Sequence, residues 1–369
     1  MSDVALTSFL NLTSSLQHLS LRNCELHGEF PAQVFQLPNL KQIDLAGNEN
    51  LTEPSSIRYV DLSYNCIGGP IPDSIFELVN LTVLDLSSNN LSGVIKPDML
   101  LKLTSLEDLD VSNNSLLSLS TSGNDVNYSF PQLKRVLFSS CNVRQFSNFF
   151  RSSKMEVLDL SNNKISGGIS KWEAEGWEEL QVLNLSHNIL TTLEQFPGKS
   201  LRILDLQSNL LQGQIPSLQI RNPYVFSISK NKLTGNIPSS ICNWSSLVIL
   251  DLSKNNLSGT IPDCLGNLSS LKFMDLQVNN VYGKIPDCFA NNELTHLILS
   301  DNRLEGLVPP SLVKSTSLEV LNLENNKLTG RLPHWLTSLL SLQVLILRCN
   351  RFHGSLSDSI TLFNVSVCE

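Results

Sequence analysis

Leucine and asparagine recur along the chain in one fixed frame. The frame L-x-x-L-x-L-x-x-N-x-L fits Leu247, Leu250, Leu252, Asn255 and Leu257. Sliding it along the chain finds fifteen repeats, and a mean spacing of about 23 residues is within the range typical of repeat architectures. Its asparagine position falls at Cys24, Asn48, Asn65, Asn89, Asn114, Cys141, Asn163, Asn188, Asn209, Asn231, Asn255, Asn279, Asn302, Asn326 and Asn350.

Each position of the frame predicts a structural role. The L-x-L centre alternates with period two, so its leucines point inward from a short strand and the residue between them points outward. A single coil cannot bury its apolar face alone, so neighbouring coils must stack and their strands must form a parallel sheet. The pattern therefore predicts a curved, right-handed solenoid of about fifteen coils with a parallel sheet on its concave side.

The asparagine is expected where the chain leaves the strand. Its amide both donates and accepts, so it can satisfy backbone groups that the turn leaves unpaired. Leaving a buried polar group unpaired costs about 1–3 kcal/mol, so a stacked asparagine ladder is predicted to hold the coils together. At Cys24 and Cys141 a thiol takes this position as a weaker donor.

Glycine and proline punctuate the rest of the repeat. Eleven repeats carry Gly four residues after the asparagine position, and eight of those carry Pro three residues later, as in LSGTIP from Leu257 to Pro262. Glycine permits turns that other residues resist, and proline fixes an extended or turning backbone. The far wall of each coil is therefore predicted to be irregular or short-stranded, without long helices.

The motif L-x-G-x-I-P, present as LQGQIP, LTGNIP, LSGTIP and VYGKIP, resembles the plant-specific extracellular leucine-rich repeat. Stretches such as HLSLRNCELHGEFP and VLILRCNRFHGSL are similar to the disease-resistance class of plant receptor-like proteins. The resemblance implies a leucine-rich-repeat solenoid of the α/β horseshoe class. It also implies a ligand-recognition ectodomain at the extracellular face of the plasma membrane, which binds a peptide, protein or other elicitor and signals through a partner receptor kinase.

We interpret residues 1–369 as one repeat array with four departures from the frame. These are an incomplete first repeat at 1–15, a shortened repeat at 49–64, irregular repeats at 115–199 and a truncated last repeat at 351–369. Only 17 residues separate Asn48 from Asn65, which suggests that about seven residues are missing through a splicing or gene-model fault. The acidic stretch from Lys171 to Glu179, with two tryptophans, predicts a short helix on the convex side.

Composition narrows the classes of function. A net charge of −8 disfavours nucleic acid or an anionic membrane as the main partner, because both bind Lys and Arg. The histidines show no metal-site spacing, and no phosphate loop, kinase signature or nucleophile elbow is present, so we expect neither an enzyme nor a cofactor. We also recognise no signal peptide and no membrane-spanning segment in this sequence.

Candidate ligand contacts are the exposed strand positions that depart from the usual residue. Asp recurs between the two core leucines, at Asp44, Asp61, Asp85, Asp110, Asp159, Asp205, Asp251 and Asp275. Because the repeat consensus LDLS places Asp there, we interpret this column as structural and not as a metal site. Apolar residues replace it at Leu137, Ile298 and Ile346. The recognition surface that we predict comprises Tyr59, Tyr64, Lys272, Phe273, Gln277, His296, Ile298, Asp301, Glu324 and Arg348. Neutral variation on exposed strands is the alternative interpretation.

Eleven Asn-x-Ser/Thr sequons favour a glycosylated, secreted product. They lie at Asn11, Asn50, Asn80, Asn90, Asn113, Asn127, Asn184, Asn243, Asn256, Asn267 and Asn364. Cys242, Cys264 and Cys288 recur near one place on the far wall, where we favour buried free thiols over disulfides.

Two other functions stay open at this point. A secreted inhibitor of a pathogen enzyme, similar to polygalacturonase-inhibiting proteins, is disfavoured because those arrays are shorter and carry cysteine caps. A non-functional truncated product is the third hypothesis, since the chain begins and ends inside a repeat.

Overall fold

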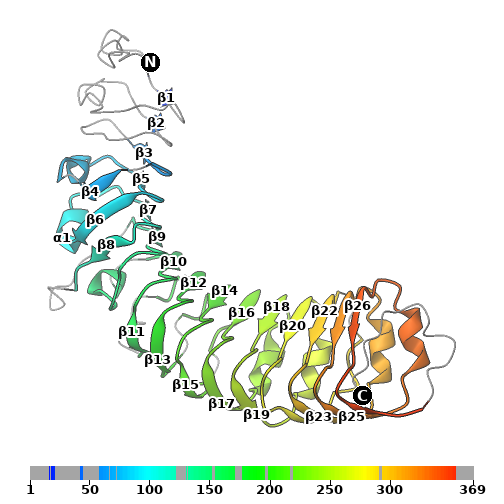
Figure 1. The fold of residues 1–369 in the computed structure, drawn as a ribbon. Helices are drawn as coiled ribbons and strands as arrows, with labels where there is room; N and C mark the ends of the chain where they lie inside the picture. Colours follow the sequence, from blue (N-terminus) through cyan, green and yellow to red (C-terminus); the bar gives the residue numbers. More distant parts are fainter. Residues whose placement is uncertain are drawn as a thin grey trace. The chain divides into compact units, whose positions relative to one another are not determined.

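The computed structural model (Figure 1) describes most of the chain from residue 58 to residue 354 and short stretches before it. The described residues are 16, 18–20, 42–44, 58–65, 67–71, 73–121, 130, 132–151, 154–170, 177–195, 198–216, 219–290 and 293–354. The chain divides into two compact units, an N-terminal unit of residues 1–166 and 172–188 and a C-terminal unit of residues 167–171 and 189–369.

In both units each repeat contributes a three-residue strand, centred on the first leucine position of its L-x-L, to a first, parallel sheet. In the N-terminal unit these strands, in spatial order, are β1 (His18–Ser20), β2 (Gln42–Asp44), β3 (Tyr59–Asp61), β5 (Val83–Asp85), β7 (Asp108–Asp110), β9 (Arg135–Leu137), β10 (Val157–Asp159) and β12 (Val182–Asn184). In the C-terminal unit they are β14 (Ile203–Asp205), β16 (Val225–Ser227), β18 (Ile249–Asp251), β20 (Phe273–Asp275), β22 (His296–Ile298), β24 (Val320–Asn322) and β26 (Val344–Ile346).

The register of this sheet keeps equivalent repeat positions side by side. Leu250, in the middle of β18, lies opposite Phe226 on one neighbour and Met274 on the other, and all three side chains are fully buried. The residues before and after them face outward. The predicted alternation of inward leucine and outward variable residue is therefore confirmed in the described strands.

Other strands, two to six residues long, form second sheets along another wall of the coils. In the N-terminal unit they are β4 (Gly68–Pro70), β6 (Asn90–Ile95) and β8 (Leu116–Leu119). The remaining short strands are β11 (Ser166–Ile169) with β13 (Ile189–Leu193); β15 (Gln212–Gln214), β17 (Lys232–Asn236) and β19 (Asn256–Ser258); and β21 (Tyr282–Lys284), β23 (Arg303–Gly306), β25 (Lys327–Gly330) and β27 (Arg351–Phe352).

Helices in the described residues are one turn long, as the glycine and proline punctuation predicts. The helix α1 spans Pro97–Leu100. The 3-10 helices are η3 (Asp73–Glu77), η4 (Asn148–Arg151), η5 (Ser239–Asn243), η6 (Asp263–Asn267), η7 (Pro310–Lys314) and η8 (His334–Ser338). Proline often sits just before or at the start of these turns because its fixed φ suits a helix start and it has no N–H to satisfy.

The asparagine ladder is present as predicted. The Nδ2 of Asn255 donates to the carbonyl oxygens of Leu252 and Ser253 within its own coil and of Ile228 in the preceding coil, at 3.0–3.2 Å. Its Oδ1 accepts from the backbone N–H of Leu233, also in the preceding coil, at 3.0 Å. At the variant position the Cys141 thiol donates to the carbonyl oxygens of Val111 and Ser139, at 3.3 and 3.6 Å. Cys24 lies outside the described residues.

The glycine four residues after the ladder position adopts a left-handed backbone conformation in every described repeat that carries it. Gly306 has a φ of +84°, which side-chain-bearing residues rarely adopt. A Cβ added there would also lie 3.1 Å from Cγ of Lys284, whose side chain crosses over it from the preceding coil. Glycine is therefore needed at this position for the turn, and at Gly306 also because a Cβ would crowd the Lys284 side chain; at Gly69 an added Cβ would meet nothing within 4 Å.

Two of our expectations fall partly or wholly on undescribed residues. The helix expected from Lys171 to Glu179 lies mostly on residues 171–176, which are outside the described residues. Most of the shortened repeat at 49–64 and all of 1–15 lie outside them as well. The strand β3 inside the shortened repeat pairs directly with β2 of the preceding coil, with Gln42 opposite Tyr59 and Asp44 opposite Asp61.

Candidate functional site

The aspartate column on the first sheet has a structural role. In each described case one carboxylate oxygen accepts from the backbone N–H two residues later; for Asp251 and Ser253 the distance is 3.0 Å. Asn184 and Asn322 occupy the same position and accept in the same way. The described residues contain no group of His, Cys, Asp or Glu arranged to hold a metal ion. The side chain of Asp44 lies outside the described residues.

Burial on the sheet raises the pKa of several of these carboxyl groups. It does so for Asp85 and Asp110, although hydrogen bonds from Ser87 and Ser112 act in the opposite direction. The largest effect is at Asp275, where burial raises the pKa to about 6. Asp275 lies opposite Asp251 on one side and the apolar Ile298 on the other. Neither neighbour donates a hydrogen bond to its carboxylate.

Eight of the ten predicted contact residues lie on or beside the adjacent strands β20, β22, β24 and β26; we call them the strand-face patch, which comprises Lys272, Phe273, Gln277, His296, Ile298, Asp301, Glu324 and Arg348. Tyr59 and Tyr64 belong to the N-terminal unit, where Tyr59 begins β3 and the Tyr64 side chain is 71% exposed.

The middle of the patch is aromatic and apolar. Phe273 and His296 lie opposite each other in the register, and their ring centroids are 5.5 Å apart. The Nδ1 of His296 is 3.0 Å from the Thr295 hydroxyl, which helps to hold the imidazole in place. Ile298 follows on the same strand and points to the same face, since strand side chains alternate.

Charged and amide groups surround this centre. The guanidinium of Arg348 forms an ion pair with the Glu324 carboxylate of the preceding coil. Lys272 lies 3.3 Å from the Glu293 carboxylate, and both groups are more than half exposed.

Two patch residues are partly engaged in holding the sheet. The Gln277 side chain donates to Asp275 at 2.8 Å, and Asp301 accepts from the Asn325 amide at 2.7 Å. Gln277 and Asp301 therefore have a structural role besides any contact with a ligand.

The structure adds residues that sequence reasoning left out of the patch. Val320 and Val344 continue the Phe273–His296 row on β24 and β26, and Ile346 lies next to them. Further along the same sheet, the Arg202 guanidinium lies 5.5 Å from the centre of the Tyr224 ring. Val320 and Val344 each precede the first core leucine of their repeat. Because valine is common at this position, the sequence did not distinguish these two residues from the others.

Seven of the eleven sequons lie in the described residues. Asn184 is half-buried: its Nδ2 lies 3.2 Å from Asp159 Oδ2, and its Oδ1 accepts from the Ser186 N–H at 3.1 Å. The other described acceptors are exposed, at Asn80, Asn90, Asn113, Asn243, Asn256 and Asn267. Those at Asn11, Asn50, Asn127 and Asn364 lie outside the described residues.

The expectation of free thiols was wrong for two cysteines. Cys242 and Cys264 form a disulfide with their Cα atoms 5.6 Å apart, while Cys288 in the next coil is a free thiol. Cys242 and Cys264 lie on η5 and η6, which stack at a separation suited to a disulfide. The sequence analysis placed these cysteines near one another on the far wall but favoured free thiols, and so did not predict the bond.

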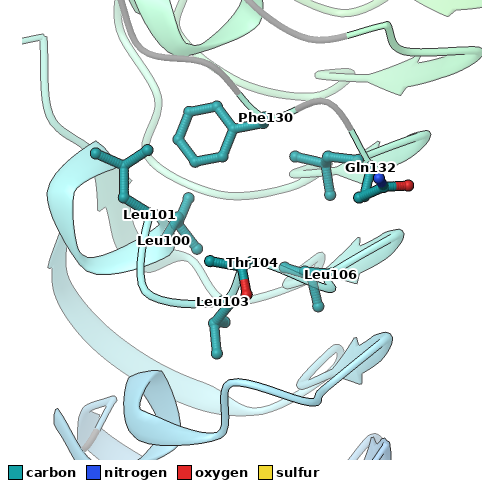
Figure 2. A pocket seen from close by; sticks show the side chains of 8 residues that line it. Leu100, Leu101, Leu103, Thr104, Leu106, Phe130 and Gln132 are labelled. Carbon is teal, nitrogen blue, oxygen red and sulfur yellow. The ribbon is translucent and has the colours of Figure 1, made fainter.

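A small apolar pocket lies between two coils of the N-terminal unit (Figure 2). It has a volume of about 130 Å³, and its walls include Leu100 and Leu101 near α1 and Phe130 and Gln132 from the following coil. Its lining contains no ionisable side chain. The pocket therefore holds no ionisable group for acid–base catalysis.

Comparison with known proteins now identifies the family. A profile described as Leucine rich repeat matches residues 223–281 and 292–352, and a second such profile matches residues 15–37, 56–78, 80–100 and 154–172. Together these matches cover more than half of the chain. Receptor-like protein 18 of Arabidopsis thaliana is 32% identical over 230 residues, which are 62% of this chain and 22% of that protein. The chain spans between 14% and 27% of the length of the curated relatives that it matches.

Solved structures share the fold over nearly the whole chain. The plant peptide hormone receptor RGFR1, in complex with RGF2, is 26% identical with a TM-score of 0.76, covering 94% of this chain and 65% of that one. The Arabidopsis receptor kinase HAESA, in complex with the peptide hormone IDA and the co-receptor SERK1, is 28% identical with a TM-score of 0.74, covering 94% of this chain and 59% of that one. No helix among the described residues is long and apolar enough to cross a membrane. The chain belongs to the leucine-rich-repeat family, and its repeats are similar to those of plant receptor-like proteins.

Proposed function

We propose that this chain is the ligand-recognition part of a plant cell-surface receptor-like protein, and that the strand-face patch binds a peptide or protein. The observation that carries the proposal is the row formed by Phe273, His296, Val320 and Val344 on four neighbouring strands. This row places apolar and aromatic side chains on a rigid sheet whose hydrogen bonds are already satisfied. Binding there requires little reordering of the protein.

The composition of the patch suits a polypeptide ligand. Aromatic residues and arginine carry much of the binding energy at protein interfaces, and here Phe273 and His296 lie inside a rim of charged side chains. The Glu324–Arg348 pair and Lys272 offer both signs of charge at the edge of the row. Such an edge can discriminate between ligands by charge, while the row supplies apolar contact.

The solved structures with this fold support a role in peptide recognition. The solved receptors with this fold include complexes with peptide hormones, and one of them also contains a co-receptor. We therefore propose that the full-length protein acts at the extracellular face of the plasma membrane and signals through a partner receptor kinase. In this proposal the present chain provides recognition and not catalysis.

The test starts from peptides selected on the immobilised chain from a random phage-displayed library. Binding of the selected synthetic peptides to purified chain variants is then measured by calorimetry. We expect Phe273→Ala to weaken binding about tenfold or more, because it removes a central aromatic contact. Charge reversal in Arg348→Glu is expected to weaken binding of peptides with an acidic residue.

The matched control is Val157→Ala, which truncates the equivalent outward position on β10 of the N-terminal unit. This variant should leave binding unchanged. If the selected peptides bind Phe273→Ala and Arg348→Glu as tightly as the original chain, the strand-face patch is not the recognition site.

A further inference from the structure

The second sheet of the last coils, formed by β21, β23, β25 and β27, carries a concentration of positive charge. Its exposed side chains, on the strands or directly after them, include five cations and one acid: Lys284, Arg303, Lys327, Arg331, Arg351 and Glu305. The chain as a whole has a net charge of −8, so this face differs in sign from the rest of the protein.

Most acidic side chains of these coils interact with groups other than the five cations of the second sheet. Glu324 pairs with Arg348 and Glu293 with Lys272. The Asp287 carboxylate accepts from the Ser311 N–H at 2.9 Å. Among the described residues, none of the five cations of the second sheet forms an ion pair; Arg303 donates only to the neutral Asn280 side chain, at 2.8 Å. Glu305 lies between Lys284 and Lys327 in the sheet register, so five cations and one acid leave this face with a net positive charge.

Exposed apolar groups lie among these cations. The Leu307 side chain, directly after β23, is 63% exposed, and the Tyr282 ring on β21 is 53% exposed. Tyr282 lies opposite Arg303 in the sheet register. Tyrosine and arginine side by side are characteristic of protein-binding surfaces, whereas isolated lysines are not.

The same face also lacks glycosylation sequons, which earlier coils carry at the equivalent position. In earlier coils the residue directly after the ladder asparagine is itself a glycan acceptor, at Asn90 and Asn256. In the last described coils Arg303, Lys327 and Arg351 occupy that position, and no sequon occurs between Asn267 and Asn364. A glycan at this position would project over the second sheet, so its absence leaves the basic face open to a partner.

We infer that the face of β21, β23, β25 and β27, which we call the basic face, is a second interaction surface that binds an acidic segment of another polypeptide. The inference goes beyond the proposed function, since it concerns a different sheet and does not depend on the ligand of the strand-face patch. A polypeptide fits better than an acidic polysaccharide because Leu307 and Tyr282 require apolar side chains as well as carboxylates opposite them.

The first experiment measures binding of acidic polymers to the full chain at several salt concentrations. The probes are a random copolymer of glutamate and tyrosine, poly-L-glutamate, and polygalacturonate of matched charge. We expect the glutamate–tyrosine copolymer to bind tightest, with an affinity that falls as salt rises because exposed charges are screened. Tightest binding of polygalacturonate would overturn the assignment to a polypeptide, and absence of binding by all three would overturn the site.

Charge-neutral variants locate the site. The triple variant Arg303→Gln, Lys327→Gln and Arg351→Gln should weaken copolymer binding about tenfold, since each exposed charge contributes modestly. Lys284 and Arg331 are left unchanged because their side chains also cover glycines of the next coil. The matched control removes three exposed lysines of earlier coils, Lys230, Lys232 and Lys254. An equal loss in the control would show a non-specific charge effect and contradict the inference.

A glycan can then be used as a steric probe. Lys327→Asn creates the sequon Asn-Leu-Thr at the position that Asn256 occupies naturally, whereas Lys327→Gln removes the same charge without a sequon. Both variants are secreted from a eukaryotic host, and occupancy is verified by mass. The glycosylated Lys327→Asn chain should lose copolymer binding far beyond the Lys327→Gln chain, and enzymatic glycan removal should restore it. Unchanged binding by the occupied chain would exclude this face.

Discussion

The side-chain amide of Asn255 donates to the carbonyl oxygen of Ile228, one coil earlier, at 3.0 Å. This bond is part of a set of four that joins the coil of Asn255 both to itself and to its predecessor. Because the same set recurs along the described chain, the outward side chains of the first sheet are held in fixed rows. The rigidity of the strand-face patch therefore derives from the buried asparagines behind it.

Removing one asparagine tests this relationship. Asn255→Ala leaves the carbonyls of Ile228, Leu252 and Ser253 and the N–H of Leu233 without their side-chain partner, so we expect a loss of about 2–4 kcal/mol in unfolding free energy. Urea unfolding followed by circular dichroism measures it. Asn255→Cys imitates the natural Cys141 and should lower the unfolding free energy less than Asn255→Ala does. An equal decrease would show that the thiol does not act as a hydrogen-bond donor.

Backbone strain is concentrated at Val278. In the described coils the residue before the ladder position adopts a left-handed conformation, and Val278 does so with a φ of +54° although it is β-branched. Asparagine tolerates this conformation and occupies it at Asn325, where φ is +51°. We expect Val278→Asn to raise stability by about 0.5–1.5 kcal/mol and the melting temperature accordingly. The converse substitution, Ser208→Val at a φ of +55°, should lower both; a stabilising Ser208→Val would refute the strain argument.

The raised pKa of Asp275 predicts a dependence of stability on pH. The pKa of about 6 in the folded chain exceeds the usual 3.8, so between pH 4 and 6 the folded state binds more protons than the unfolded state. The contribution of this group to stability therefore falls as pH rises through that window. Asp275→Asn keeps an acceptor for the Gln277 N–H, as Asn184 does for Ser186.

We accordingly expect Asp275→Asn to be more stable than the original chain by about 1 kcal/mol at pH 7.5, and to lose this advantage at pH 4. Urea unfolding at the two pH values measures the difference. A greater advantage at pH 4 than at pH 7.5 would mean that the carboxylate is favoured, and not penalised, by its surroundings.

The disulfide is expected to stabilise the C-terminal unit. Cys242 and Cys264 close a loop with a sequence separation of 22, and opening such a loop typically costs about 2–4 kcal/mol. The variant Cys242→Ser with Cys264→Ser should therefore unfold at a lower temperature than the oxidised chain. Tryptic peptides mapped without reduction should show these two cysteines linked and Cys288 alkylated; a link from Cys264 to Cys288 would contradict the assignment.

Much of the fold could be predicted from the sequence because every coil solves the same packing problem. The leucines, ladder asparagines and glycines are each specified by one local requirement, so a single frame located the strands and the turns. The Cys242–Cys264 bond could not be found this way, since it depends on how η5 and η6 stack and not on equal spacing. The helix expected from Lys171 is untested.

The candidate site was predictable only in outline. Departures from the repeat consensus pointed to Phe273, His296 and Arg348, and the register explains why these residues share one face. Sequence spacing did not reveal that Gln277 and Asp301 are occupied by bonds within the sheet. Nor did it distinguish Val320 from the many valines that fill the same position, since its importance depends on its neighbours.

The most direct measurement of the central claim is hydroxyl-radical footprinting of the chain with and without a selected peptide. If the strand-face patch is the recognition surface, oxidation of Phe273 and His296 should fall on binding while that of the exposed Tyr64 in the N-terminal unit stays constant. Unchanged oxidation of Phe273 and His296, with protection of residues elsewhere, would contradict the account.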